Sequence, residues 1–205
     1  MTAAFWDERY RSSTSVWSGD PNPQLVTEVS GLGPGYALDV GSGEGADAMW
    51  LAERGWRVLA VDISTVALER SAALAAKAAP GVPARIEWKQ ADILTWSPEP
   101  GAFDLVSAQF MQLPAEDRDP FFRRLAAAVA PHGTLLVVGH HPSDLETTAR
   151  RPRGAGVLYP PEAIASLLHA GQWEIVASEA RPRSAVDPEG RTVTVHDTVV
   201  RALRR

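Results

Sequence analysis

A glycine-rich turn between an apolar run and a helical pattern constrains the fold of this chain more than any other feature. Residues 38–45 contain three glycines at alternate positions, Gly41, Gly43 and Gly45. Glycine lets the backbone approach a ligand closely, because no Cβ intervenes. The helix expected from Ala46 directs N–H groups at the turn, which favours a bound carboxylate or phosphate. About twenty residues later, the apolar run 58–61 ends in Asp62, an acid placed to accept the hydroxyls of an adenosine ribose.

Strand-like runs and helical patterns alternate after this turn. Strands are expected at residues 37–40, 57–61, 85–89, 103–108 and 134–138, with helices from Ala46, after Ser64 and from Asp119. Such alternation favours a parallel sheet with helices on both faces. Two further runs, 173–178 and 192–200, flank a turn at 187–190 and predict an antiparallel hairpin. The predicted fold class is α/β, a mostly parallel, doubly wound sheet with a C-terminal antiparallel hairpin.

Composition limits the possible partners. The 205 residues carry a net charge of −5, which argues against binding nucleic acid through its phosphates. Cysteine is absent, which excludes disulfides and thiolate metal sites, and we see no spacing of His, Asp and Glu that indicates a metal. No apolar run approaches the roughly 18 residues of a membrane span. The first eleven residues lack the apolar core of a secretory signal, so we expect a cytoplasmic protein.

The turn by itself fits two classes of cofactor. The pattern Gly41-x-Gly43-x-x-Ala46 satisfies the dinucleotide fingerprint and would suit an NAD(P)-dependent oxidoreductase. The pattern Gly41-x-Gly43-x-Gly45 with Asp39 before it looks like the motif of the S-adenosylmethionine-dependent methyltransferases. The only lysines, Lys77 and Lys89, do not follow a tyrosine by four residues, so the Tyr-x-x-x-Lys pair of short-chain dehydrogenases is missing.

From Phe5 to its C-terminus, the chain resembles the class I S-adenosylmethionine-dependent methyltransferases. Four segments carry the resemblance: 38–45, 61–64, 90–93 and 103–106, the last leading into 109–112. Segments 5–10 and 17–19 are similar to the branch that holds the thiopurine and tellurite-resistance methyltransferases. The resemblance implies a seven-stranded Rossmann-like sheet whose last strand inserts antiparallel, and S-adenosyl-L-methionine as cofactor. We expect a single domain over residues 1–205, with residues 1–32 as an N-terminal helical cap.

The resemblance also implies roles for residues at the ends of the strands. The turn would face the methionine part of the cofactor, and Asp39 would approach its amino group. Asp62 would hold the ribose, and Asp92 the adenine amino group. The implied cofactor-binding set is Trp17, Asp39, Gly41, Ser42, Gly43, Gly45, Asp62, Ile63, Ala91, Asp92, Ile93 and Gln109.

Two basic features could serve the methyl acceptor. His140 and His141 follow the strand at 134–138, where open α/β sheets bind ligands, and either is a candidate general base because histidine titrates near neutrality. The alternative is a polar loop contact. Residues 150–153, near Arg181 and Arg183, form either a solvated face or a clamp for an anionic substrate. The aromatic residues before Asp20 either pack on the core or form a flap over the cofactor.

Together these observations predict a methyltransferase that acts on a heteroatom (O, N or S) of a small aromatic or heterocyclic molecule. The expected partner is this small methyl acceptor, with no nucleic acid and no membrane. Two alternatives stay open: the NAD(P)-dependent oxidoreductase and a non-enzymatic module that binds S-adenosylmethionine. The sequence does not reveal the oligomeric state.

Overall fold

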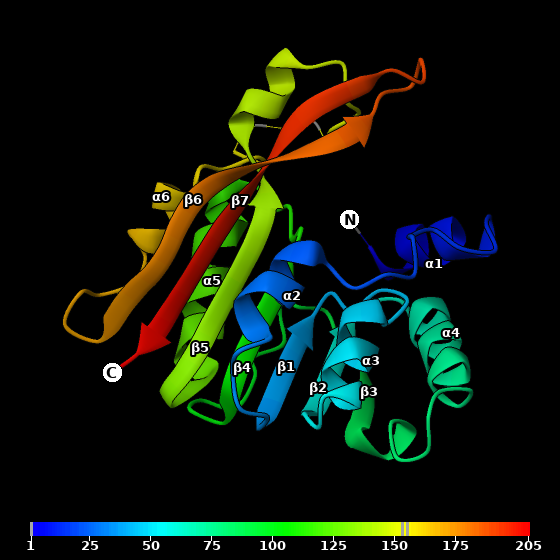
Figure 1. Ribbon diagram of the computed structural model, residues 1–205, viewed down its shortest axis with the longest axis vertical. Helices are drawn as coiled ribbons and strands as arrows, with labels where there is room; N and C mark the ends of the chain where they lie inside the picture. The colour runs from blue at the N-terminus through cyan, green and yellow to red at the C-terminus, as the bar shows by residue number, and fades with distance from the viewer. Residues whose placement is uncertain (1, 153, 155) are drawn as a thin grey trace.

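The computed structural model describes residues 2–152, 154 and 156–205. Its strands are β1 (Tyr36–Val40), β2 (Arg57–Asp62), β3 (Ile86–Gln90), β4 (Phe103–Gln109), β5 (Val129–His140), β6 (Trp173–Val186) and β7 (Thr192–Arg204). They form one seven-stranded sheet in the order β3-β2-β1-β4-β5-β7-β6 (Figure 1). β7 runs antiparallel to both β5 and β6, and the other pairs are parallel. The predicted fold class is confirmed.

Helices cover both faces of the sheet. One core joins the sheet to α2 (Pro23–Val29), α3 (Ala46–Glu53) and α4 (Thr65–Ala75), through side chains such as Leu25, Leu51 and Ala75. The other core joins it to α5 (Ala115–Ala128) and α6 (Pro161–Ala165), through Phe121, Phe122 and Ile164. The central strands are apolar nearly throughout because both of their faces are covered. α1 (Ala3–Arg11) lies outside these layers and packs on α4 (Figure 1).

Two helix starts follow from local sequence. Asn22 Oδ1 accepts the Gln24 N–H at 2.9 Å, and Pro23 occupies the first turn of α2. Ser64 Oγ accepts the Ala67 N–H at 3.2 Å and caps α4. The helix predicted after Ser64 is confirmed.

Three elements extend beyond their predicted bounds. α5 begins at Ala115 rather than at Asp119, so Pro120 lies inside the helix, in its second turn, where it removes one backbone hydrogen bond. β6 continues past Ser178 to Val186 and includes Pro182, which an edge strand accepts. β5 continues to His140, so this histidine is the last residue of a strand.

The strand order changes direction at β1. β1 pairs with β2 on one side and with β4 on the other. The carboxyl ends of the parallel strands and the loops after them therefore meet at one edge, which is where open α/β sheets bind ligands.

None of the helices in the described ranges is long and apolar enough to cross a membrane.

Candidate active site

The glycine-rich turn closes on itself at the carboxyl end of β1. Gly41, Gly43 and Gly45 all have positive φ, at 72°, 53° and 83°. The N–H groups of Gly41 and Ser42 donate to the Val61 carbonyl at 2.8 and 3.1 Å. The Gly45 N–H donates to the Ser42 carbonyl at 2.9 Å. The turn therefore offers a ligand close approach rather than these three N–H groups.

Side chains lie directly against the glycines. A Cβ at Gly41 would clash with Met111 Sδ, and a Cβ at Gly43 would lie 3.0 Å from Tyr10 Oη and 3.2 Å from Trp17 Nε1. The sequence did not connect Met111 or Tyr10 with the turn. The contact could not be predicted, because it joins segments about 30 and 70 residues apart in the chain.

Two carboxyl groups lie beneath the turn. Asp39 on β1 is 2% exposed, and its Oδ2 has no hydrogen-bond partner within the described chain. Burial, with Asp47 and Asp62 nearby, raises the pKa of Asp39 well above its usual range. Asp47 in the first turn of α3 accepts the Asn22 N–H at 2.6 Å, and burial raises its pKa to about 6. A cationic group of a ligand placed beside this pair would favour the ionised form of the carboxyls.

These pKa shifts predict a pH-dependent affinity for the cationic amino group of S-adenosylhomocysteine. We expect the affinity to fall below about pH 6, by at most about tenfold per pH unit for each proton that binding must release. In the ligand-free protein, stability changes with pH in the opposite direction to the ligand affinity. The folded carboxyls hold protons more tightly than the unfolded ones, so the free energy of unfolding falls as pH rises from about 4 to about 6.

Calorimetric titration in two buffers of different ionisation enthalpy would count the protons released on binding at about pH 6. Asp47→Asn keeps an oxygen for the Asn22 N–H and removes the titrating group. We expect it to flatten the pH profile. An unchanged profile in this variant would assign the pH dependence to another group.

Asp62 at the end of β2 connects the turn to α4. Its Oδ2 accepts the Gly43 N–H and its Oδ1 the Ser64 N–H, both at 2.9 Å. Burial raises the pKa of Asp62, and the two backbone N–H groups oppose that shift. Each carboxylate oxygen keeps a further lone pair. The geometry therefore allows Asp62 to accept ribose hydroxyls without breaking the turn.

The remaining side chains of the implied cofactor set lie at neighbouring strand ends. Ile63, Ala91, Asp92 and Ile93 are half-buried after β2 and β3. The Ala91 N–H donates to the Asp62 carbonyl at 3.0 Å, so the two loops are in contact. Asp92 Oδ1 accepts the Leu94 N–H at 2.9 Å. These residues surround the end of the sheet at which an adenine ring would follow the ribose.

The N-terminal segment is attached to the glycine-rich turn through Glu44. Its Oε2 accepts the N–H groups of Val16 and Trp17 at 3.0 and 3.1 Å, and its Oε1 pairs with Arg70 at 3.1 Å. Trp17 Nε1 donates to Tyr10 Oη at 3.0 Å, beside Gly43. Tyr10 is buried, whereas the Trp17 side chain is 49% exposed. The segment is thus held in place by the buried Tyr10 and presents the exposed ring of Trp17 at the turn.

We expect Glu44→Ala to release residues 13–17 and to weaken the binding of S-adenosylhomocysteine about fivefold, equivalent to roughly 1 kcal/mol. Trypsin should cleave after Arg9 and Arg11 faster in this variant than in the wild type. Glu53→Ala, which removes an exposed glutamate from α3, is the matched control and should change neither property. Faster cleavage with unchanged affinity would show that the segment does not cover the ligand.

The ends of β4 and β5 form the other side of this edge. Gln109 Nε2 donates to Ser107 Oγ at 2.7 Å, while its Oε1 is buried without a partner in the described ranges. Phe110 follows with a φ of 53° and stacks on the His140 ring, with centroids 4.6 Å apart. Burial, with the charges of Arg151 and Arg183, lowers the pKa of His140 to about 3. The expectation that His140 titrates near neutrality is therefore wrong.

His141 is held by its own loop. Its Nδ1 accepts the Ser143 N–H at 3.2 Å and lies 2.9 Å from Ser143 Oγ, so the ring caps the short helix η2 (Pro142–Glu146). The neutral ring then carries its proton on Nε2. His141 therefore has a capping role, and the lone pair that a base needs is engaged there. His140 has its Nδ1 buried without a partner among the described residues.

Unpaired polar atoms gather at this one edge. Of the buried side-chain nitrogen and oxygen atoms without a partner in the described chain, only Arg201 Nε lies elsewhere. Buried polar groups in folded proteins nearly always have partners, so such a cluster indicates that a polar ligand is expected there. The six atoms at the edge belong to Asp39, Ser42, Gln109, Gln112, His140 and Arg151. Within the same described ranges, no group of three His, Asp or Glu residues could hold a metal.

A family comparison defines the class of the central part of this chain. Residues 37–133 match the model of a methyltransferase domain. This match, the sheet order and the glycine-rich turn identify that part as a class I S-adenosylmethionine-dependent methyltransferase domain, whose methyl donor is S-adenosylmethionine. The oxidoreductase alternative is thereby set aside.

The alignments with individual relatives cover only part of this chain and part of each relative. A 2-heptyl-1-hydroxyquinolin-4(1H)-one methyltransferase of Mycobacteroides abscessus is 30% identical over 126 residues, which are 60% of this chain and 54% of the relative. A trans-aconitate 2-methyltransferase of Paracidovorax citrulli is 34% identical over 136 residues, 65% of this chain and 46% of the relative. The chain thus spans about half the length of the curated relatives it matches.

Solved structures show the same fold over nearly the whole chain. TehB from Haemophilus influenzae has a TM-score of 0.73 at 15% identity, over 99% of this chain and 67% of TehB. An S-adenosylmethionine-dependent methyltransferase from Anabaena variabilis also has a TM-score of 0.73, at 18% identity, over 99% of this chain and 93% of that one. The likeness to TehB supports the predicted resemblance to the tellurite-resistance branch at the level of the fold.

Proposed function

We propose that this chain transfers a methyl group from S-adenosylmethionine to a heteroatom of a small aromatic or heterocyclic molecule. The observation that carries the proposal is the set of unpaired, buried polar atoms at the carboxyl edge of the sheet. On the cofactor side they belong to Asp39, Ser42 and Gln109, and on the acceptor side to Gln112, His140 and Arg151. Two adjacent polar sites are what a two-substrate transfer requires.

The residues present fit the methyl donor. Asp39 Oδ2 is a buried acceptor without a partner among the described residues, as the donor's amino group requires. The three glycines of the turn place no Cβ between its backbone and a ligand. Asp62 would hold the ribose hydroxyls, and Trp17 would flank the ligand from the N-terminal segment. Ile63 and Asp92, with Ala91 and Ile93 beside them, would contact the adenine.

The chemistry asks mainly for positioning. When bound, S-adenosylmethionine supplies an activated methyl group, whose bond to sulfur breaks as the acceptor's lone pair forms the new bond and leaves its electrons on sulfur. The protein's part is to align the acceptor and exclude water, which lowers such barriers by up to roughly 7–11 kcal/mol. With a pKa of about 3, His140 is neutral and a weak base. It would orient an acceptor through a hydrogen bond.

Two relatives support a small acceptor. Their names specify a hydroxyquinolinone and trans-aconitate, both small molecules. The ring of Phe110 and the thioether of Met111 lie beside the glycine-rich turn and provide an apolar surface for a flat molecule. The acceptor side thus combines one aromatic wall with several polar atoms.

Calorimetric titration with S-adenosylhomocysteine and, separately, with NADH tests this proposal first. We expect micromolar binding of the former and none of the latter. Turnover would then be measured as release of S-adenosylhomocysteine in a screen of phenols, thiols, amines and heterocycles. Binding without turnover on any acceptor would favour the non-enzymatic binding module instead.

A further inference from the structure

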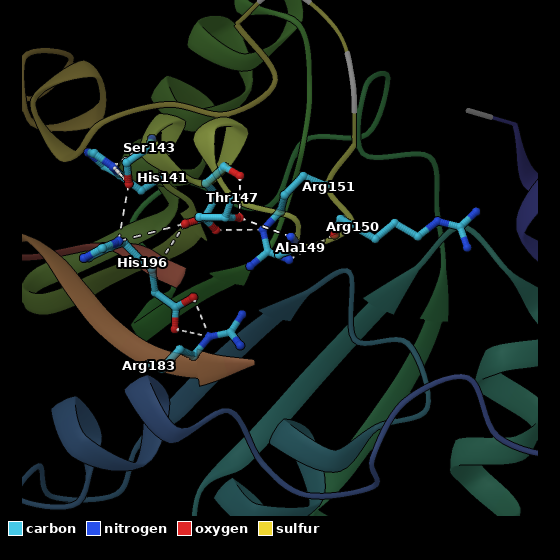
Figure 2. A network of polar contacts seen from close by, with 10 residues as sticks. His141, Ser143, Thr147, Ala149, Arg150, Arg151, Arg183 and His196 are labelled. Atoms are coloured by element: carbon cyan, nitrogen blue, oxygen red, sulfur yellow. Dashed lines mark hydrogen bonds and ion pairs between the residues drawn. The ribbon is translucent and has the colours of Figure 1, made fainter. Parts of the chain in front are cut away.

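We infer, on the basis of the proposed function, that the methyl acceptor carries a carboxylate and that this carboxylate binds the guanidinium of Arg151. Arg151 lies in the loop beyond the carboxyl end of β5, after η2. It belongs to the network of polar contacts shown in Figure 2. The inference rests on how the nitrogens of this guanidinium are distributed and on the charges around it.

The protein holds two of the three guanidinium nitrogens of Arg151. Its Nε donates to Asp144 Oδ2 at 2.7 Å, and its Nη1 donates to the Arg150 carbonyl at 3.0 Å. Its Nη2 is buried and has no hydrogen-bond partner among the residues that the structure describes. The side chain is only 10% exposed. A buried N–H group without an acceptor is costly, so this geometry calls for an acceptor from outside the chain.

Asp144 orients Arg151 but does not accept a hydrogen bond from its Nη2. Asp144 is fully buried, and its Oδ1 accepts the His196 backbone N–H at 2.7 Å. Its other oxygen accepts the hydrogen bond from Arg151 Nε. The carboxylate is thus held on both sides and keeps the guanidinium in one position. A planar guanidinium fixed in this way matches the geometry of a carboxylate better than a flexible ammonium does.

The charges around this loop favour an anion. Asp144 compensates Arg151, and Asp197 compensates Arg183 by accepting its Nε at 2.8 and 3.0 Å. The Arg150 side chain is exposed and forms no ion pair within the described ranges, and Figure 2 shows it pointing away from the network. By sequence, residues 141–153 contain three arginines (Arg150, Arg151 and Arg153) against Asp144 and Glu146, which is one positive charge in excess, although the whole chain carries −5. A local excess of this kind attracts an anionic group.

This positive charge acts on the acceptor side of the edge. The charges of Arg151 and Arg183, together with burial, hold the His140 ring in its neutral form. The same ring stacks on Phe110, next to Met111 at the glycine-rich turn. The Arg151 network also touches the end of β5, because the His141 N–H donates to the His196 carbonyl at 3.1 Å and the His196 N–H donates to Asp144. An acceptor whose ring lies on Phe110 would therefore lie beside this network. The geometry combines an aromatic surface for the ring with a cationic site for its carboxylate.

A separate cavity on the same loop is not the proposed site. It has a volume of about 720 Å³ and lies between residues 144–151 and the turn of the β6–β7 hairpin. Asp144 and Arg151 are among its lining residues, but none of the residues that we assign to the cofactor lines it. The Nη2 atom of Arg151 is itself buried.

Matched acids and amides test the inference on the whole chain. The probes are the 4-hydroxy, 4-amino and 4-mercapto forms of benzoate and benzamide, titrated in the presence of S-adenosylhomocysteine and assayed for turnover with S-adenosylmethionine. We expect the acids to bind at least about tenfold more tightly than the amides. Arg151→Lys keeps a cation for Asp144 but removes Nη2, and we expect it to weaken the acids about tenfold and leave the amides unchanged. Arg191→Lys, which alters the exposed pair with Asp187, is the matched control.

The outcomes are separable from failure of the proposed function. If S-adenosylhomocysteine binds but no acid binds more tightly than its amide, the inferred carboxylate of the acceptor is overturned, whereas the proposed methyltransferase function stands. If S-adenosylhomocysteine does not bind, both fail. Equal losses for acids and amides in Arg151→Lys would assign Arg151 a structural role and overturn the inference. If Arg151→Lys melts early, the comparison of acids with amides in the wild type keeps the inference falsifiable.

Discussion

Asp62→Ala is expected to raise the dissociation constant of S-adenosylhomocysteine about 100-fold. A carboxylate that accepts two ribose hydroxyls contributes roughly 1.5–3 kcal/mol through each charged hydrogen bond, and part of this is recovered by water in the variant. The protein should remain folded but melt several degrees lower. The reason is that the N–H groups of Gly43 and Ser64 lose their acceptor.

The ribose contact can be separated from the loosened turn. In the wild type, an analogue of S-adenosylhomocysteine without the ribose hydroxyls should bind much more weakly than the parent ligand. In Asp62→Ala the two ligands should bind alike, which a structural effect alone would not produce. Asp104→Ala is the matched control, because Asp104 also accepts a backbone N–H, from Tyr36 at 2.8 Å, but lies at the start of β4 on the opposite edge. Persistent discrimination in Asp62→Ala would contradict the assignment.

Gly41→Ala is expected to abolish measurable binding of S-adenosylhomocysteine, a loss of at least about 100-fold. The new Cβ would clash with Met111 Sδ and would stand where the ligand approaches the turn. The φ of 72° adds about 1–2 kcal/mol of backbone strain to the cost in stability. Calorimetric titration and thermal unfolding would measure the two effects.

Gly101→Ala isolates the backbone strain. Gly101 has a φ of 66°, close to that of Gly41, but a Cβ there would meet no atom within 4 Å. We expect it to lower stability without changing affinity. Gly41→Ala combined with Met111→Ala should recover part of the lost stability, because the clash is removed. Full affinity in Gly41→Ala would show that the ligand does not approach the turn at this residue.

Local sequence was sufficient to predict the elements and the edge that bears the site. Apolar runs bounded by glycine and proline define the strands, and the caps at Asn22 and Ser64 follow from the chemistry of one short side chain each. Once parallel strands alternate with helices, their carboxyl ends must share an edge, so Asp39, Asp62 and Gln109 could be grouped before any coordinates were known. The length of β6 was missed because its Pro182 is acceptable only on an edge strand, and strand order decides which strand is at the edge.

Tertiary structure decided what each polar group at that edge can do. The sequence could not show that the turn satisfies its own N–H groups, that burial lowers the pKa of His140, or that Ser143 engages His141. It also could not distinguish Arg151, held by a buried Asp144, from its exposed neighbour Arg150. Residue type determines which chemistry is possible. Burial and the partners contributed by distant segments determine which side chains are protonated and which of their polar atoms stay without a hydrogen-bond partner. These depend on packing, which is long-range and is not encoded in any local pattern.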